Sequence, residues 1–141
     1  MIQGLNHITL AVSDVETAFT FYREVLGCQP LARWQRGAYL LAGDLWLCLS
    51  LDQATRSTPL LEYTHVAFTV EPEDFAAWRS RLTAAQIPQW KDNTSEGNSL
   101  YILDPDGHKL ELHVGDWRSR LAAAKAAPFA GGMEFFVEVA H

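Results

Sequence analysis

An internal repeat constrains the fold of this chain more than any other feature of its sequence. The stretch HITLAVSDVETAFTFYREVLG at residues 7–27 resembles HVAFTVEPEDFAAWRSRLTAA at residues 65–85. In each copy a histidine begins an alternating segment that predicts a β-strand, and an acidic N-cap region and an amphipathic helix follow. The apolar helical positions Val15, Ala18 and Tyr22 correspond to Phe75, Trp78 and Leu82.

Each predicted helix is followed by a pattern typical of a β-hairpin. RGAYLLAGDLWLCLS turns near Gly43 and Asp44, and SLYILDPDGHKLELHV turns through residues 104–107. Each half of the chain is therefore predicted as βαβββ, with one short strand uncertain. A half of about 60 residues buries too little apolar surface to be more than marginally stable alone. We therefore expect the two halves to join into one structure.

The predicted domain is α+β and covers the whole chain. After the second hairpin, Asp116 is suited to cap a short Ala-rich helix that Pro128 ends, and the tail GGMEFFVEVAH is expected to be peripheral. The expected parts of the single domain 1–141 are a first module at about 1–50, a polar linker at about 51–62, a second module at about 63–115, and the C-terminal helix and tail at 116–141.

Composition excludes several classes of protein. The net charge of −6 disfavours nucleic-acid binding, which needs a basic surface that displaces counterions from phosphates. No apolar run approaches the ~18 residues that span a bilayer. The N-terminal MIQGLNHITLAV lacks the basic region and cleavage site of a signal peptide, so we expect a cytoplasmic protein. Cys28 and Cys48 are too few for a disulfide framework and are expected to be reduced thiols.

Strand alternation predicts where the polar side chains point. His7, Thr9 and Ala11 share one face of the first strand, and the apolar residues between them pack on the helices. The same alternation puts His65 of the second copy, and Glu111 of the last strand, opposite the helices. If the sheets curl into a cup, both histidines and Glu111 converge inside it, where an unpaired carboxylate is unfavourable.

Two repeat-related histidines and an inward carboxylate favour a divalent metal site. Three protein ligands leave coordination positions open, as in catalytic centres, and suit Mn²⁺, Fe²⁺ or Zn²⁺ better than Ca²⁺. A chelated substrate oxygen would be polarised, which makes its carbon electrophilic. Two alternatives stay open: a lone histidine at a strand start is commonly a structural residue, and Glu111 can simply pair with Lys109 or His113.

The segment WKDNTSEGNSLY, residues 90–101, is the second candidate region. Its hydroxyls and glycine can wrap oxygen ligands around a hard cation or donate backbone N–H groups to an anion. Lys91 and Arg120 are the cations best placed in the sequence to meet an acidic substrate there, Arg being suited to bidentate contact. The alternative is a solvated loop flanked by ordinary surface charges.

Short motifs spread along residues 1–132 resemble one known family. LNHITLAVSD, GAYL, LWLCLS, YTHVAF, W-K-x-N, SEGNS and Y-x-LDPDGHKLELHVGD are similar to the fosfomycin-resistance glutathione transferases of the FosA type. The resemblance implies a vicinal-oxygen-chelate (glyoxalase) fold, in which paired βαβββ modules form a cup-shaped metal site in a module-exchanged homodimer. It also implies Mn²⁺, stimulation by K⁺, and an activity in which the glutathione thiol opens the epoxide of fosfomycin or a similar phosphonate, conferring resistance.

The same resemblance implies roles for individual residues. It implies that His7, His65 and Glu111 bind the metal. Thr9 and Tyr39 are implied in catalysis, and Thr9 is suited to hydrogen-bond the nascent alkoxide. The implied substrate-binding residues are Thr9, Trp46, Cys48, Lys91, Ser95, Ser99, Tyr101 and Arg120, the implied potassium residues are Asn93, Ser95, Glu96, Gly97 and Ser99, and Trp34 matches the pocket wall.

Four competing functions share this framework. A fosfomycin hydrolase needs an acidic base near Tyr39, which RGAYLLAG does not offer. A related transferase uses another thiol with Mg²⁺. Thr94 bears on the choice of thiol, because the family more often has a basic residue there. Val66 is a second departure, at a position that is more often Tyr. An extradiol dioxygenase would use the same ligands for Fe²⁺ without a phosphonate site. An antibiotic-binding protein on this fold would typically dispense with metal ligands.

Overall fold

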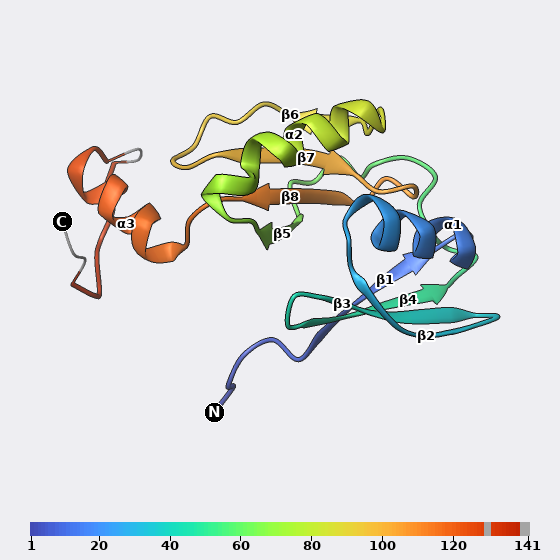
Figure 1. Ribbon diagram of the computed structural model, residues 1–141. Coiled ribbons are helices and arrows are strands. Elements are labelled where there is room, and N and C mark those ends of the chain that lie inside the picture. Colours follow the sequence, from blue (N-terminus) through green and yellow to red (C-terminus); the bar gives the residue numbers. More distant parts are fainter. Residues whose placement is uncertain (129–130, 139–141) are drawn as a thin grey trace.

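The computed structural model describes residues 1–128 and 131–138, and in it the repeat forms two sheets that lie one above the other (Figure 1). The end of the expected peripheral tail, residues 139–141, lies outside the described residues. The first module holds β1 (His7–Val12), α1 (Val15–Thr20), a π-helical continuation η1 (Phe21–Val25), β2 (Gln29–Trp34), β3 (Gly37–Ala42) and β4 (Leu45–Leu51).

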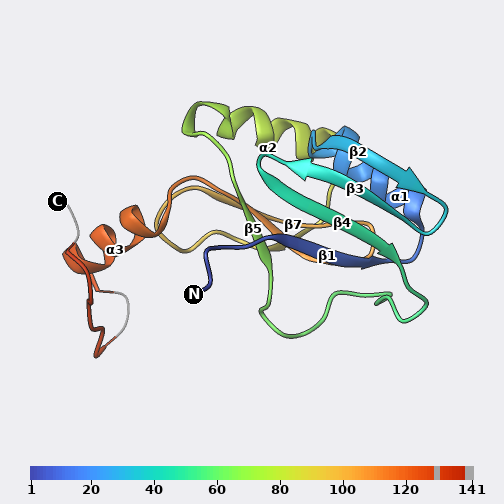
Figure 2. The ribbon, with the colours of Figure 1, turned by 90° about the horizontal axis from the view of Figure 1, so that it is seen from below.

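The second module repeats this order after a linker without regular structure. After the second module, the helix α3 (Trp117–Ala126) projects from the body with the tail (Figures 1 and 2). Within the described chain no helix has both the length and the apolar character needed to cross a bilayer. The second module holds β5 (Val66–Thr69), the 3₁₀ turn η2 (Pro72–Asp74), α2 (Phe75–Ala84), β6 (Gln89–Lys91), β7 (Ser99–Leu103) and β8 (Lys109–His113).

The two sheets have the same topology. Their strand orders are β1-β4-β3-β2 and β5-β8-β7-β6. In each sheet the first strand pairs in parallel with the last, and the remaining pairs are antiparallel. The predicted paired βαβββ architecture and α+β class are therefore confirmed. β1 and β5 each have one paired neighbour and stand at an open sheet edge, since within the described chain the two sheets remain separate.

Local sequence explains where the helices begin. The Asp14 side chain accepts a hydrogen bond from the Thr17 backbone at 2.9 Å, which caps α1 and lowers the pKa of the Asp14 carboxyl. Asp116 caps α3 in the same way and forms a capping box with Ser119, as predicted for the tail helix. Gly27 adopts a left-handed conformation, φ 72°, directly after the first helix, and lets the chain turn into β2.

The core runs through both modules. The predicted helical positions are buried or partly buried: Tyr22 and Ala18 are fully enclosed in the first module, and Phe75 and Leu82 are buried in the second. They pack against the apolar faces of both sheets in one continuous cluster. The opposite face of each sheet is therefore left for the polar side chains.

A turn of the second module is docked into the first. The Tyr22 hydroxyl donates to Asp104 at 2.7 Å, and the Ser13 hydroxyl and backbone both donate to Asp106. His108 Nε2 donates to the carbonyl of Ala11 at 2.7 Å. Burial raises the pKa of the Tyr22 hydroxyl well above its ordinary value, so it stays a donor. These contacts fix how the two modules are oriented within the chain.

Candidate functional site

The first half of the candidate site lies on the open face of the β1-β4-β3 sheet. Pairing places His7 beside Trp46, and Thr9 beside Cys48. On the next strand, Tyr39 pairs with Cys48. Because directly paired residues share a face, these five predicted site residues point to one side, away from the helices. We call this set the His7 half-site.

Aromatic rings cover most of the His7 half-site. The Trp46 ring lies 4.8 Å from the His7 ring and 5.2 Å from the Tyr39 ring, and Tyr39 contacts Trp34 at 4.8 Å between centroids. His7 Nδ1 donates to the amide oxygen of Asn6 at 2.7 Å. The tautomer with hydrogen on Nδ1 leaves the Nε2 lone pair of His7 free for a metal ion.

The second half of the candidate site lies on the open face of the β5-β8-β7 sheet. His65 Nε2 and Glu111 Oε1 are 3.0 Å apart. His65 Nδ1 lies 2.9 Å from the Tyr63 carbonyl, which only accepts, so Nδ1 must donate to it. In a neutral imidazole, Nε2 then carries a lone pair that faces a carboxylate oxygen. Two acceptors at this distance need a positive charge between them, either a proton shared by the pair or a metal ion, and a divalent metal fits that donor set.

Glu111 is held on its other oxygen as well. The Ser99 hydroxyl donates to Glu111 Oε2 at 2.6 Å, and His113 Nδ1 lies 3.2 Å from the same oxygen. The Glu111 side chain is only 8% exposed. Of the two simple partners considered for it, His113 is in contact, whereas Lys109 donates to the carbonyl of Glu62. We call Glu111 with His65, Ser99 and His113 the Glu111 half-site.

The two half-sites do not meet within one chain. Among the described residues there is no group of three or more His, Cys, Asp or Glu side chains placed to hold a metal ion. His65 and Glu111 are together on the second sheet, and His7 stands on the first. Within the described residues, His7 is therefore not grouped with His65 and Glu111.

The Lys91 ammonium is a positive charge that lies beside the Glu111 half-site. Its ammonium donates to the Tyr63 hydroxyl at 2.6 Å and lies over the Tyr63 and Tyr101 rings at 4.8 and 4.9 Å. The hydrogen bond with Tyr63 raises the pKa of the Lys91 ammonium. The cation is therefore kept charged beside two aromatic faces that leave it accessible to an anion.

Two residues near the proposed ligands, Tyr63 and Trp90, were missed from the sequence, and His113 was considered only as a pairing partner of Glu111. Tyr63 is two residues before His65 and so shares its side of the chain, a signal that alternation offers. Trp90 contacts the His65 ring at 5.4 Å because β6 carries a bulge between Gln89 and Lys91. No sequence pattern marks that bulge, which lets Trp90 and Lys91 both reach the site.

The predicted potassium loop, residues 92–98, is closed by its own polar groups. Asn93 donates to the Gly97 carbonyl at 2.7 Å and accepts from the Ser95 backbone at 3.1 Å. Arg120 on α3 pairs with Glu96 at 3.2 Å, so its guanidinium is tied to this loop. Arg120 and His113 also line a cavity of about 290 Å³ beside β5. The loop, the Arg120 cation and the Glu111 half-site thus adjoin one another.

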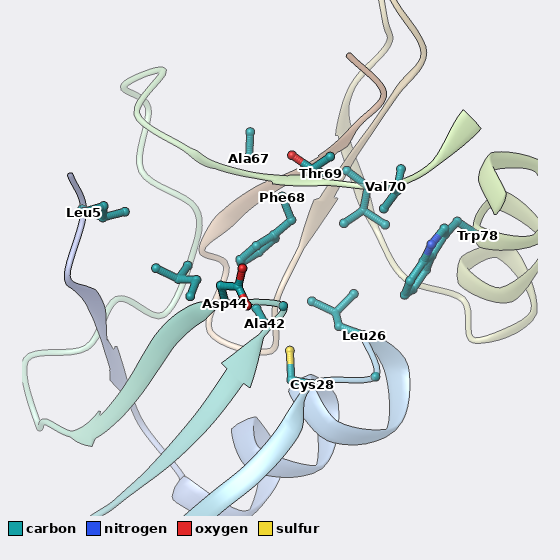
Figure 3. Close-up of a pocket in the computed structure, with 14 residues that line it drawn as sticks. Leu5, Leu26, Cys28, Ala42, Asp44, Ala67, Phe68, Thr69, Val70 and Trp78 are labelled. Atoms are coloured by element: carbon teal, nitrogen blue, oxygen red, sulfur yellow. The ribbon is translucent and has the colours of Figure 1, made fainter. Parts of the chain in front are cut away.

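A second cavity, of about 560 Å³, lies between the modules and contains none of the predicted site residues (Figure 3). Phe68 of β5 points into it, Leu26 and Cys28 line the side opposite β5, and Trp78 of α2 also lines it. Burial raises the pKa of the Cys28 thiol to about 11, which leaves no thiolate at neutral pH. Cys28 is therefore a structural thiol, whereas Cys48 belongs to the His7 half-site.

Comparison with known proteins identifies the family of this chain. The model of the Glyoxalase/Bleomycin resistance protein/Dioxygenase superfamily matches residues 4–112. Glutathione transferase FosA of Serratia marcescens is 56% identical over 133 residues, covering 93% of this chain and 94% of the relative. Metallothiol transferase FosB of Staphylococcus haemolyticus is 39% identical, with 90% and 94% covered.

Solved structures of fosfomycin resistance protein FosX from Listeria monocytogenes share the fold. One complex with Mn(II) and sulfate has a TM-score of 0.74 at 29% identity, covering 87% of this chain and 98% of the other. A variant with Mn(II) and 1S,2S-dihydroxypropylphosphonic acid has a TM-score of 0.73 at 27% identity, with 86% and 99% covered. This chain therefore belongs to the glyoxalase, bleomycin resistance protein and dioxygenase superfamily and, within it, to the family of FosA-type fosfomycin-resistance transferases.

Proposed function

We propose that this protein is a metal-dependent glutathione S-transferase that opens the epoxide ring of fosfomycin or a similar small phosphonate. The observation that carries the proposal is the Glu111 half-site, where His65 Nε2 and Glu111 Oε1 face each other at 3.0 Å, and a neutral His65 presents a lone pair to the carboxylate. Similarity to a glutathione transferase along nearly the whole chain supports the same activity. The reaction fits the cytoplasm, where thiols are kept reduced.

The proposed metal is Mn²⁺, bound by His7 of one chain and by His65 and Glu111 of a second chain in a module-exchanged homodimer. Two features support this assembly. The described chain brings only two of the three ligands together, and β1 and β5 each present an open edge suited to a partner strand. When bound, the divalent ion neutralises phosphonate charge and polarises the epoxide oxygen.

The protein's own residues supply binding, orientation and proton handling. Lys91 and Arg120 meet the phosphonate oxygens, with Ser95, Ser99 and Tyr101 as further hydrogen-bonding groups. Thr9 donates to the developing alkoxide. The thiol sulfur forms a bond to an epoxide carbon as its C–O bond breaks, and the oxygen takes up the proton that the thiol gives up. The reaction is therefore a net addition of thiol to epoxide.

The His7 half-site is proposed to receive the thiol. Tyr39, Trp34 and Trp46 form its aromatic wall, which keeps water from the reacting carbon. β3 has the sequence GAYLLA and carries no carboxylate to activate water. A thiol is favoured over water for this reason, and FosB, a metallothiol transferase, is a second relative of the same kind.

A potassium ion is proposed to bind at the loop of residues 92–98. The loop and the first residue of β7 together offer carbonyl, hydroxyl and carboxylate oxygens from Asn93, Ser95, Glu96, Gly97 and Ser99. Its contact with Arg120 places it beside the proposed phosphonate site. A monovalent cation there would organise the groups that bind the anion.

Product analysis by mass spectrometry tests the proposed reaction. Purified protein is incubated with Mn²⁺, K⁺ and fosfomycin, with glutathione in one arm and water alone in the other. The expected product is an adduct with the summed mass of glutathione and fosfomycin, formed only with the thiol. A diol in both arms would instead indicate a hydrolase, and unchanged fosfomycin in both would indicate a binding protein.

A further inference from the structure

His113 makes contacts that the proposed reaction does not use. It lies on β8, two residues after Glu111, and its side chain is 14% exposed. Its Nδ1 is 2.6 Å from the Ser99 hydroxyl and 3.2 Å from Glu111 Oε2, and the same hydroxyl is 2.6 Å from Glu111 Oε2. The three polar groups therefore form a closed triangle at Oε2, the carboxylate oxygen that does not face His65.

Counting hydrogens gives this triangle a direction. The Ser99 hydroxyl has one hydrogen and donates it to the Glu111 carboxylate, which only accepts. The Ser99 oxygen can then make its second contact, with His113, only as an acceptor. His113 must therefore carry its hydrogen on Nδ1 and donate it to Ser99. The chain of donors runs from His113 through Ser99 to Glu111 Oε2.

The His113 ring is held in place by the loop before β7. Gly97 has φ 78°, and a Cβ added there would lie 3.0 Å from His113 Cε1 and 2.6 Å from the Val114 carbonyl oxygen. The backbone of Gly97 thus packs directly against the imidazole, where no side chain fits. The ring is fixed by this glycine on one side and by its Ser99 hydrogen bond on the other.

We propose that His113 is a positioning residue that holds the Glu111 carboxylate through Ser99. With Oε2 occupied by this relay, Oε1, the oxygen that faces His65, is the one presented to the metal. Loss of the relay frees the carboxylate to rotate, which weakens metal binding without removing a ligand. This inference rests on the proposed metal role of Glu111 and does not depend on the identity of the thiol or the phosphonate.

Two substitutions at one position test the relay. In His113→Asn the amide nitrogen can take the place of Nδ1, whereas in His113→Gln it reaches toward the place of Nε2. Mn²⁺ affinity is measured by electron paramagnetic resonance on metal-stripped protein without thiol or phosphonate. His113→Gln should bind Mn²⁺ about 10- to 100-fold more weakly, the usual effect of losing a supporting residue. His113→Asn should remain close to the unaltered protein.

Two further variants separate the relay from general damage. Ser99→Ala breaks the same chain of donors, so the double variant with His113→Gln should bind Mn²⁺ no more weakly than the weaker single variant. Thr69→Val is the matched control, because Thr69 pairs with His113 on the neighbouring strand and has no part in the relay; its Mn²⁺ affinity should be unchanged. Circular dichroism and thermal melting establish that each variant is folded.

The outcomes distinguish the relay from the proposed function. Equal Mn²⁺ affinity in His113→Gln and the unaltered protein overturns the relay, as does a His113→Asn variant as weak as His113→Gln. Additive losses in the double variant overturn it as well. An unaltered protein that binds no Mn²⁺ overturns the proposed metal centre, and with it this inference. Tight, His113-dependent Mn²⁺ binding without adduct formation supports the relay and refutes only the transferase activity.

Discussion

In the Glu111 half-site both oxygens of the Glu111 carboxylate have hydrogen-bonding or ionic partners, whereas in the His7 half-site the His7 imidazole stands beside a row of aromatic rings. Glu111 contacts His65, Ser99 and His113. His7 is exposed and hydrogen-bonds only its neighbour Asn6 among the described residues. One chain therefore prearranges two of the proposed ligands and the proposed anion-binding groups, and leaves the third proposed ligand on an exposed surface that the proposed partner chain would cover.

This difference divides the proposed chemistry between the modules. The second module gathers Lys91, the Arg120-bound loop and the carboxylate, which suit an anionic substrate and a cation. The first module contributes apolar walls and a single imidazole. The two modules carry histidines at equivalent positions of the repeat, His7 at the start of β1 and His65 directly before β5, but their surroundings differ. The comparison predicts unequal consequences when each half-site is altered.

Replacing Glu111 should have the largest effect. Glu111→Gln removes the charged ligand while keeping the shape of the side chain, so turnover at ordinary Mn²⁺ concentrations should fall more than the 10- to 100-fold expected for a supporting residue. Metal content, measured by atomic emission, should fall with activity. Lys109→Gln, a change two residues away on the same strand, is the control and should retain its metal. Full activity in metal-depleted Glu111→Gln would remove Glu111 from the proposed centre.

Mixing two inactive variants tests whether the half-sites come from different chains. His7→Ala and Glu111→Ala chains, each inactive alone, are co-refolded and mixed dimers are isolated with two affinity tags. In a shared-site dimer, one centre receives both lesions and the other receives neither, so about half of the normal activity should return. Proven mixed dimers without activity, or an active monomer, would contradict the shared centre. Either result would change how the three proposed ligands are arranged but would leave their identities untouched.

Stimulation of turnover by potassium should depend on the loop beside the Glu111 half-site. If residues 92–98 bind a monovalent cation, K⁺ should stimulate turnover more than Na⁺ at matched ionic strength and subsaturating substrate. Gly97→Ala is a sharp companion variant, since the new Cβ would meet the Val114 carbonyl at 2.6 Å and distort the loop. It should lose the difference between the two salts. Equal rates of the unaltered protein in K⁺ and Na⁺ would deny the loop a cation-specific role.

More of the fold than of the candidate site could be predicted from the sequence. Matching periodicities at residues 7–27 and 65–85 predict two equivalent modules, because burial of one strand face and one helix stripe is a local requirement. Alternation likewise predicts that His7 and Thr9 share a face. The docking of Asp104, Asp106 and His108 into the first module joins residues about 90 positions apart and left no local signal.

The parts of the site that were missed depend on irregular backbone or on long-range contact. Trp90 faces His65 only because β6 is bulged. His113 has the parity of Glu111 and was considered as its partner, but its link through Ser99 depends on the register between β7 and β8. The family resemblance implied that Ser99 binds the substrate and potassium. In the structure its hydroxyl contacts Glu111 and His113.

The smallest expected effect concerns the Tyr63 hydroxyl and the pH dependence of the Glu111 half-site. The hydrogen bond with Tyr63 raises the pKa of Lys91 above its ordinary value of 10.5, so the folded protein favours the charged form. This contribution to stability is fully present below that ordinary value and is lost as pH rises through the higher folded pKa. Lys91 is thus charged with or without Tyr63 throughout pH 6–9, a range of roughly neutral assay conditions well below the lysine pKa.

Tyr63→Phe should therefore leave the shape of the pH–rate profile between pH 6 and 9 unchanged, the range over which lysine remains protonated. Because the ammonium is exposed, losing one anchor should raise the KM for the phosphonate by about fivefold or less and leave kcat nearly unaltered. Steady-state kinetics at several pH values measure both quantities, and Lys91→Gln, which removes the charge itself, provides the larger reference effect. A new ionisation below pH 9 in Tyr63→Phe would show that Tyr63 controls the charge of Lys91 rather than its position, and that this half-site is less prearranged than its contacts indicate.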